Sequence, residues 1–129
     1  MGEPVWVDKR ALLVLHSRSI AVHGGAEGLR DEGLLDSALH RPWNHFRYEG
    51  VADLADLAAV HGAAIAGNHP FVDGNKRAAF QCVALFLRLN GLRLRADRIE
   101  ATRMVLAIAA GDLAVDDFAR WVKANYIVD

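Results

Sequence analysis

The stretch His69–Arg77 reads HPFVDGNKR and brings together a histidine, a carboxylate, a glycine, an amide and two adjacent cations. Pro70 cannot continue a preceding helix and Gly74 permits a left-handed backbone, so we expect a loop that enters a new helix near Asn75. The free backbone N–H groups of Gly74, Asn75 and Lys76 and the dipole of the new helix would attract an anion, and the two cations add full charge. The stretch therefore predicts a phosphate-binding site.

These residues resemble the signature of the Fic/Doc superfamily, HxFx(D/E)GN(G/K)R, and the lysine after the asparagine is that of its Doc, or death-on-curing, variant. The segment Gly24–Ala38, GG-x-x-G-L-R-D-E-G-L-L-D-S-A, is similar to the N-terminal part of Doc-like toxins. The resemblance covers nearly the whole chain. It implies a compact all-α domain of about six helices, with a central buried helix after the motif.

Composition favours one soluble domain over residues 1–129, because 53% of the chain is hydrophobic and 24% is charged. A net charge of −1 gives no general attraction to nucleic acid or to membranes, so we expect neither as a direct partner. The longest uncharged run, Leu57–Val72, is interrupted by polar residues and proline and is too short to span a bilayer. The single cysteine, Cys82, cannot form an internal disulfide, which favours a reducing cytoplasm.

Apolar residues recur at helical spacing in six segments, most of which follow a candidate N-cap aspartate. The expected caps are Asp8, Asp31, Asp53, Asp97 and either Asp116 or Asp117. The expected ends are Gly24-Gly25, Pro42, about Gly67, Asn90-Gly91 and Gly111. The fourth segment, Lys76–Leu89, is apolar nearly all round and is therefore predicted to be buried on most sides.

Two segments show no helical period. Arg41–Gly50, RPWNHFRYEG, is predicted to be a loop or short flap, and its aromatic part Trp43–Tyr48 is a candidate contact surface. Leu92–Ala96 alternates and is expected to be briefly extended.

The candidate catalytic residues are His69, Asp73, Lys76 and Arg77. A neutral His69 imidazole beside a phosphate could take a proton from an attacking hydroxyl, as the matching histidine does in the family; the alternative is a histidine that is hydrogen-bonded at a helix end. The Asp73 carboxylate suits Mg²⁺ that bridges nucleotide phosphates, and its alternative role is a helix N-cap.

The remaining candidates surround the expected helix start. Asn75 is predicted to support the loop and to donate to phosphate, and Gly74 is needed for its backbone. Arg77 offers a bidentate fork and Lys76 a mobile point charge. Their alternative is a solvated basic helix start, although two cations at the positive end of a helix are unfavourable without an anion. Gln81 is either a further phosphate contact or a polar interruption of a packed helix.

Two positions separate this chain from nucleotidyl-transferring Fic proteins, which usually carry glycine at the position of Lys76 and a second arginine at that of Phe80. In Doc toxins the same change accompanies an inverted nucleotide and transfer of the γ-phosphate. The resemblance thus implies a toxin kinase that uses ATP and Mg²⁺ to phosphorylate a hydroxyl of elongation factor Tu and halts translation. Two alternatives stay open, namely nucleotidyl (AMP) transfer to a protein hydroxyl and a non-catalytic module that binds an anion or a peptide.

The chain lacks the inhibitory pattern (S/T)-x-x-x-E-(G/N) by which some Fic proteins restrain themselves. Its Glu-Gly pairs at Glu27 and Glu49 follow His23 and His45 at the required spacing. We therefore expect an antitoxin that acts in trans through a disordered C-terminal segment. The histidines outside the motif show no zinc-site spacing and are assigned no metal.

Overall fold

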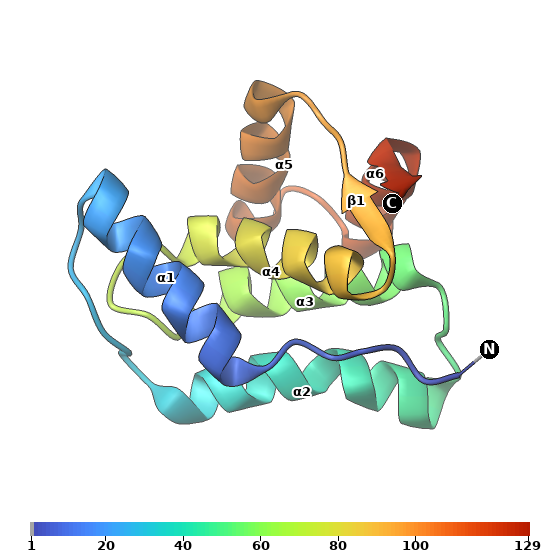
Figure 1. Cartoon of the computed structure of the whole chain (residues 1–129), viewed down its shortest axis with the longest axis horizontal. Coiled ribbons are helices and arrows are strands. Elements are labelled where there is room, and N and C mark those ends of the chain that lie inside the picture. Colours follow the sequence, from blue (N-terminus) through green and yellow to red (C-terminus); the bar gives the residue numbers. More distant parts are fainter. Residues whose placement is uncertain (1) are drawn as a thin grey trace.

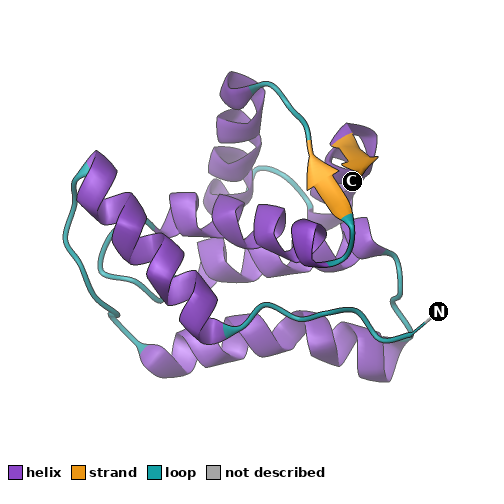
Figure 2. Cartoon of the chain, in the orientation of Figure 1, coloured by secondary structure: helices purple, strands orange, loops and turns teal. Residues whose placement is uncertain are grey.

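The computed structural model describes residues 2–129, which form six helices and one two-stranded sheet (Figure 1; Figure 2). The helices are α1 (Lys9–His23), α2 (Glu32–Glu49), α3 (Leu54–Asn68), α4 (Asn75–Leu89), α5 (Arg98–Ala110) and α6 (Val115–Asn125). The strands are β1 (Leu92–Leu94) and β2 (Tyr126–Val128). The predicted all-α class and number of helices are confirmed. None of the helices in this described part is long and apolar enough to cross a lipid bilayer.

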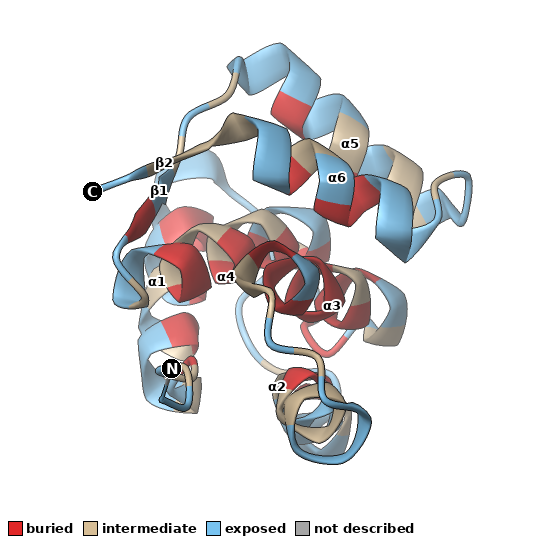
Figure 3. Cartoon of the chain, turned by 90° about the vertical axis from the view of Figure 1, so that its right-hand side faces the viewer, coloured by how far each residue is buried: buried red, intermediate tan, exposed pale blue. Residues whose placement is uncertain are grey.

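The core is built around α3 and α4, which lie side by side in the middle of the molecule (Figure 1). Figure 3 shows their buried faces between α2 on one side and α5 and α6 on the other. Almost every residue from Ala55 to Ala66 is buried, so α3 is as central as the predicted α4. Gly62 permits the close approach, because a Cβ atom there would lie 2.7 Å from Val83 Cγ2 and 3.1 Å from the Phe118 ring.

Aspartate caps begin four of the helices, as predicted. Each carboxylate accepts from backbone N–H groups of the first turn, and the capping residues are Asp8, Asp31, Asp53 and Asp97. The prediction for the last helix was wrong, because α6 starts after Ala114 and has Asp116 and Asp117 inside its first turn. Carboxylates there still interact favourably with the positive end of the helix dipole.

The predicted loop at Arg41–Gly50 is instead the second half of α2, which runs through Pro42 to Glu49. Proline inside a helix removes a hydrogen bond and costs about 3 kcal/mol. Burial offsets this cost, because Pro42 lies on the same face as the buried Leu35 and Ala38. Among the aromatic residues of the second half, Tyr48 is 74% exposed.

The predicted extended piece is β1, which pairs antiparallel with β2 in the register Leu92↔Val128, Arg93↔Ile127 and Leu94↔Tyr126. The sequence did not predict β2, because its three residues follow α6 without a break. Leu92 is buried, so the small sheet ties the end of α6 to the end of α4.

Candidate active site

The HPFVDGNKR segment connects α3 to α4 and forms a hollow of about 400 Å³. The lining residues are His69, Val72, Asp73, Gly74, Asn75, Lys76 and Arg77. Every predicted site residue except Gln81 is thus in one place. In Figure 1 the α3–α4 connection lies at the edge of the molecule, beside the connection from α1 to α2.

The start of α4 has backbone N–H groups that no side chain caps. Gly74 occupies the N-cap position with φ 75°, and no side chain caps the helix. The N–H groups of Asn75, Lys76 and Arg77 in the first turn therefore lack helical acceptors. The N–H of Gly74 was also predicted to point at the anion, but it donates to Asp73 Oδ1 over 2.8 Å.

Asn75 holds the loop together from inside. It is buried, its Oδ1 accepts from the Phe71 N–H at 2.9 Å, and its Nδ2 donates to the Phe71 carbonyl at 3.0 Å. The predicted loop-supporting role agrees with this geometry. The predicted side-chain donor to phosphate is instead engaged within the loop. The free donor of Asn75 is its backbone N–H, which lacks a helical acceptor in the first turn of α4.

His69 caps the carboxyl end of α3 in a left-handed conformation, with φ 50° and ψ 56°. It is the only non-glycine residue among residues 2–129 with a positive φ. Its N–H donates to the Ile65 carbonyl at 3.2 Å, and its side chain is exposed at the hollow. The predicted alternative, a histidine that is hydrogen-bonded at a helix end, therefore applies to the backbone of His69. Its imidazole ring is exposed to solvent at the hollow.

Arg30, which the sequence did not single out, holds this corner of the loop. Its Nε donates to the His69 carbonyl at 2.7 Å and its Nη2 to the Asn68 carbonyl at 2.9 Å. The backbone N–H groups of Arg30 and Asp31 both donate to the Pro70 carbonyl, at 2.7 and 3.0 Å. The α1–α2 connection is therefore a direct support of the motif.

Asp73 is exposed and does not cap α4, which excludes its predicted alternative role. Its Oδ2 accepts from the Ala26 N–H at 3.3 Å, and a Cβ atom at Gly25 would lie 2.7 Å from the same oxygen. Each carboxylate oxygen keeps a free lone pair. Residues 2–129 contain no group of three or more potential metal-binding side chains. A single carboxylate nevertheless suits Mg²⁺, which takes most of its ligands from water and substrate.

His16 is a second support that the sequence did not reveal. It is buried, its Nε2 lies 2.7 Å from the Asp73 carbonyl oxygen, and its ring stacks on Phe71 with centroids 3.8 Å apart. A carbonyl oxygen can only accept, so Nε2 carries the proton. His16 lies four residues from both Leu12 and Ile20, which belong to the buried face of α1. This spacing could have predicted from the sequence that His16 is buried.

Both cations of the motif are exposed, and neither takes part in an ion pair within residues 2–129. Arg77 Nη1 lies 3.4 Å from Ser19 Oγ, which directs its guanidinium. Lys76 and Arg77 therefore place two uncompensated charges at the positive end of α4.

Comparison with known proteins supports the motif. Residues 6–87 match the Fic/DOC family. The chain belongs to this family. It is 31% identical over 120 residues to "Protein kinase doc" of Escherichia phage P1, a match that covers 93% of this chain and 94% of the relative. It is 44% identical over 85 residues to "Toxin Doc" of Mycolicibacterium smegmatis, which covers 65% of each chain.

Two residues of α4 that the sequence singled out lie away from the motif hollow. Phe80 and Gln81 line a different hollow beside Leu15 of α1. Gln81 Nε2 lies 3.4 Å from the Leu15 carbonyl, so the structure separates this residue from the predicted phosphate contacts. The polar interruption of a packed helix is the role that its position supports.

Cys82 and His61 lie in the core of the molecule. Cys82 Sγ is 3.6 Å from His61 Nδ1, and both residues are fully buried. Burial raises the pKa of Cys82 to about 12 and lowers the pKa of His61 to about 3. The thiol is therefore protonated and inaccessible, and the prediction that Cys82 is a small buried hydrophobe is confirmed.

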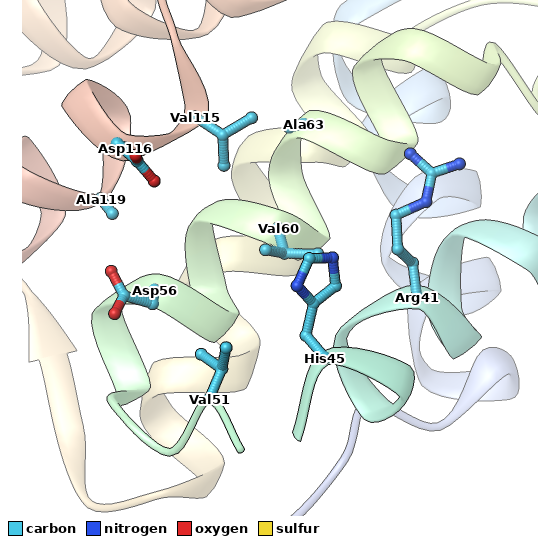
Figure 4. Close-up of a pocket in the computed structure, with 9 residues that line it drawn as sticks. All are labelled: Arg41, His45, Val51, Asp56, Val60, Ala63, Val115, Asp116 and Ala119. Atoms are coloured by element: carbon cyan, nitrogen blue, oxygen red, sulfur yellow. The ribbon is translucent and has the colours of Figure 1, made fainter. Parts of the chain in front are cut away.

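A second hollow, of about 360 Å³, lies between α2, α3 and α6 (Figure 4). Asp56 and Asp116 lie on one side of its apolar floor, and Arg41 and His45 lie on the other. Burial, followed by the charge of Asp53, raises the pKa of Asp56. None of the motif residues lines this hollow, and it contains no pair of cations at a helix start.

Proposed function

We propose that this Fic/DOC chain is a toxin that transfers the γ-phosphate of ATP to a protein hydroxyl, with elongation factor Tu as its target. The observation that carries the proposal is the uncapped, doubly basic start of α4 beside the exposed His69. The printed names of the two relatives, a protein kinase and a toxin, support the same function.

The chain's own residues suit phosphoryl transfer, in which catalysis is mainly positioning and charge stabilisation. The N–H groups of the first turn of α4 hold the phosphates, together with the side chains of Lys76 and Arg77. His69 takes the proton of the attacking hydroxyl as that oxygen bonds to the γ-phosphorus and the bond between this phosphorus and ADP breaks. The place of His69 at the same hollow as the phosphate site supports this role.

Asp73 is the residue that would hold Mg²⁺ next to these phosphates. When bound, the ion neutralises negative charge that collects on the transferring group. The two backbone N–H donors that Asp73 accepts from keep its carboxylate at the rim of the hollow. They also leave it one free lone pair on each oxygen.

Lys76 and Phe80 favour γ-phosphate transfer over nucleotidyl transfer. The lysine fills space that glycine would leave open at the start of α4. Phe80, at the position of the second arginine of the nucleotidyl-transferring branch, faces another hollow and supplies no clamp for distal phosphates.

We further propose that a separate antitoxin restrains the enzyme through a segment that orders on binding. Arg77 is paired with Ser19 and with no glutamate of residues 2–129, so its guanidinium remains available to such a partner. Because the target is a translation factor, the cytoplasm is the expected place of action.

Expression in a bacterium tests the toxin function. The wild-type chain should stop growth and protein synthesis, and His69→Ala should remove both effects. His23→Ala is the matched control, since His23 is exposed at the end of α1 and does not line the motif hollow. Growth arrest that is unchanged in His69→Ala would instead support a non-catalytic binding module, and absence of arrest in the wild type would contradict the toxin function.

A further inference from the structure

The carboxyl end of α3 carries His69 on a left-handed backbone, which few residues other than glycine adopt. Left-handed conformations at helix ends usually belong to glycine, and another residue there costs on the order of 1 kcal/mol. His69 nevertheless has φ 50°. A contact outside α3 that favours this conformation would offset that cost.

Arg30 provides that contact. Its guanidinium donates through Nε to the His69 carbonyl at 2.7 Å and through Nη2 to the Asn68 carbonyl at 2.9 Å. These two carbonyls follow one another across the residue whose φ is positive. A planar fork that binds both of them restricts the backbone between them, which a single flexible donor does not.

The positive charge of Arg30 also lies at the carboxyl end of α3, which is the negative end of the helix dipole. The last turn of α3 contains no basic residue, so the helix itself supplies nothing to its negative end. Arg30 brings a full positive charge there from the α1–α2 connection. The position of that connection is fixed by backbone bonds, because Arg30 N–H and Asp31 N–H donate to the Pro70 carbonyl and Val72 N–H donates to the Gly28 carbonyl.

We propose that Arg30 is a positioning residue that holds His69 in the orientation required for proton transfer. The inference rests on the proposed kinase function for its kinetic consequence, while its structural part concerns the backbone of His69 alone. Arg30 does not line the motif hollow, so it acts through His69 and not by binding nucleotide.

Kinetics of Arg30→Ala provide the first test. The turnover number for target phosphorylation should fall about tenfold, because small misplacements of a reacting group are costly, while the KM for ATP stays within about twofold. Free guanidinium ion at millimolar concentration should restore part of the turnover, and Arg30→Lys should lie between the two proteins. Arg103→Ala is the matched control, an exposed arginine on α5 that should retain wild-type kinetics.

The backbone of His69 provides a test that needs no activity. In NMR spectra of the wild type, the three-bond HN–Hα coupling and the Cα shift of His69 should report a left-handed residue. In Arg30→Ala they should shift toward values averaged over other conformations, and in Arg103→Ala they should not change. If Arg30→Ala does not fold, the positioning role is tested with Arg30→Lys, in which the same coupling and Cα shift of His69 should move in the same direction.

The two proposals fail separately. A turnover number of Arg30→Ala equal to that of the wild type, or His69 couplings unchanged in that variant, would overturn the positioning role. A fall in turnover that guanidinium does not restore, together with a melting temperature well below that of the wild type, would assign Arg30 to general folding. This result would also overturn the positioning role. If the wild type transfers no phosphoryl group, the kinase function fails, and the NMR comparison still decides on Arg30.

Discussion

Under the proposed function, the choice between phosphoryl and nucleotidyl transfer depends on Lys76. It is exposed in the first turn of α4, with no ion-pair partner among residues 2–129. A hydrogen bond to a charged group contributes about 1.5–3 kcal/mol, so we expect Lys76→Gly to lose about tenfold to a hundredfold in phosphorylation. It should not gain efficient nucleotidyl transfer, because Phe80 supplies no second arginine. Lys76→Met keeps the bulk without the charge and should lose activity as well. Full phosphorylation by Lys76→Gly would disprove the assigned role.

Asp73 is expected to make the reaction depend on a divalent cation. Asp73→Asn removes the charge that Mg²⁺ needs, so turnover should collapse, whereas the melting temperature should change little because the side chain is exposed. Turnover can be measured against magnesium concentration, with Asp112→Asn, an exposed residue after α5, as control. Activity that persists in the presence of a chelator would contradict the metal role.

At this scale the sequence predicted the residues of the motif but not their supports. His69, Asp73 and Arg77 could be assigned because they lie within nine residues, and the structure places them around one hollow. His16 is 57 positions from Asp73, and Arg30 is 39 positions from His69. Contacts at such separations depend on the packing of α1 and of the α1–α2 connection, which no local pattern reveals.

At the scale of the helices, two glycines of α3 make a matched pair. A Cβ atom at Gly62 would lie 2.7 Å from Val83 Cγ2, whereas a Cβ atom at Gly67 would have nothing within 4 Å. Alanine is favoured over glycine in a helix by up to about 1 kcal/mol. We therefore expect Gly67→Ala to raise the free energy of unfolding by a few tenths of a kcal/mol, and Gly62→Ala to lower it by about 1–3 kcal/mol through overpacking.

Urea unfolding of the two variants and the wild type measures both effects. The structure requires opposite signs for the same substitution within one helix. An increase in stability for Gly62→Ala would show that α3, α4 and α6 leave room for a methyl group at this position.

The four helix starts with aspartate caps were predictable because these caps are local interactions. Asp53, for example, caps α3 through the N–H groups two and three residues later, so the sequence contains the whole interaction. The continuation of α2 through Pro42 and the strand β2 were not predicted, because both depend on contacts with distant parts of the chain. Pro42 is accepted inside α2 because it is buried, and β2 exists because β1 lies beside it. Tertiary packing outweighed local preference in both cases.

At the scale of the whole molecule, stability should depend on pH through His61. The residue is buried beside Phe86 and Cys82, and desolvation lowers its pKa from 6.5 to about 3. The folded state therefore keeps His61 neutral, while the unfolded state binds a proton below pH 6.5. The contribution of His61 to stability is thus complete above pH 6.5 and is lost progressively as the pH falls toward 3.

Unfolding free energies at pH 7 and pH 5 test this linkage. Between these two values the wild type should lose about 2 kcal/mol through His61. His61→Leu should show a correspondingly smaller difference, whatever its stability at pH 7. An equal loss in both proteins would show that His61 is protonated in the folded state.

The proposed function requires that the hollow at the start of α4 phosphorylates a protein hydroxyl. The most direct test is the intact mass of elongation factor Tu after incubation with the purified chain, ATP and Mg²⁺. The wild type should add the mass of one phosphate, and His69→Ala should add nothing. Addition of a nucleoside monophosphate would contradict the proposed kinase function. An unchanged target mass, with wild-type protein that arrests bacterial growth, would also contradict it.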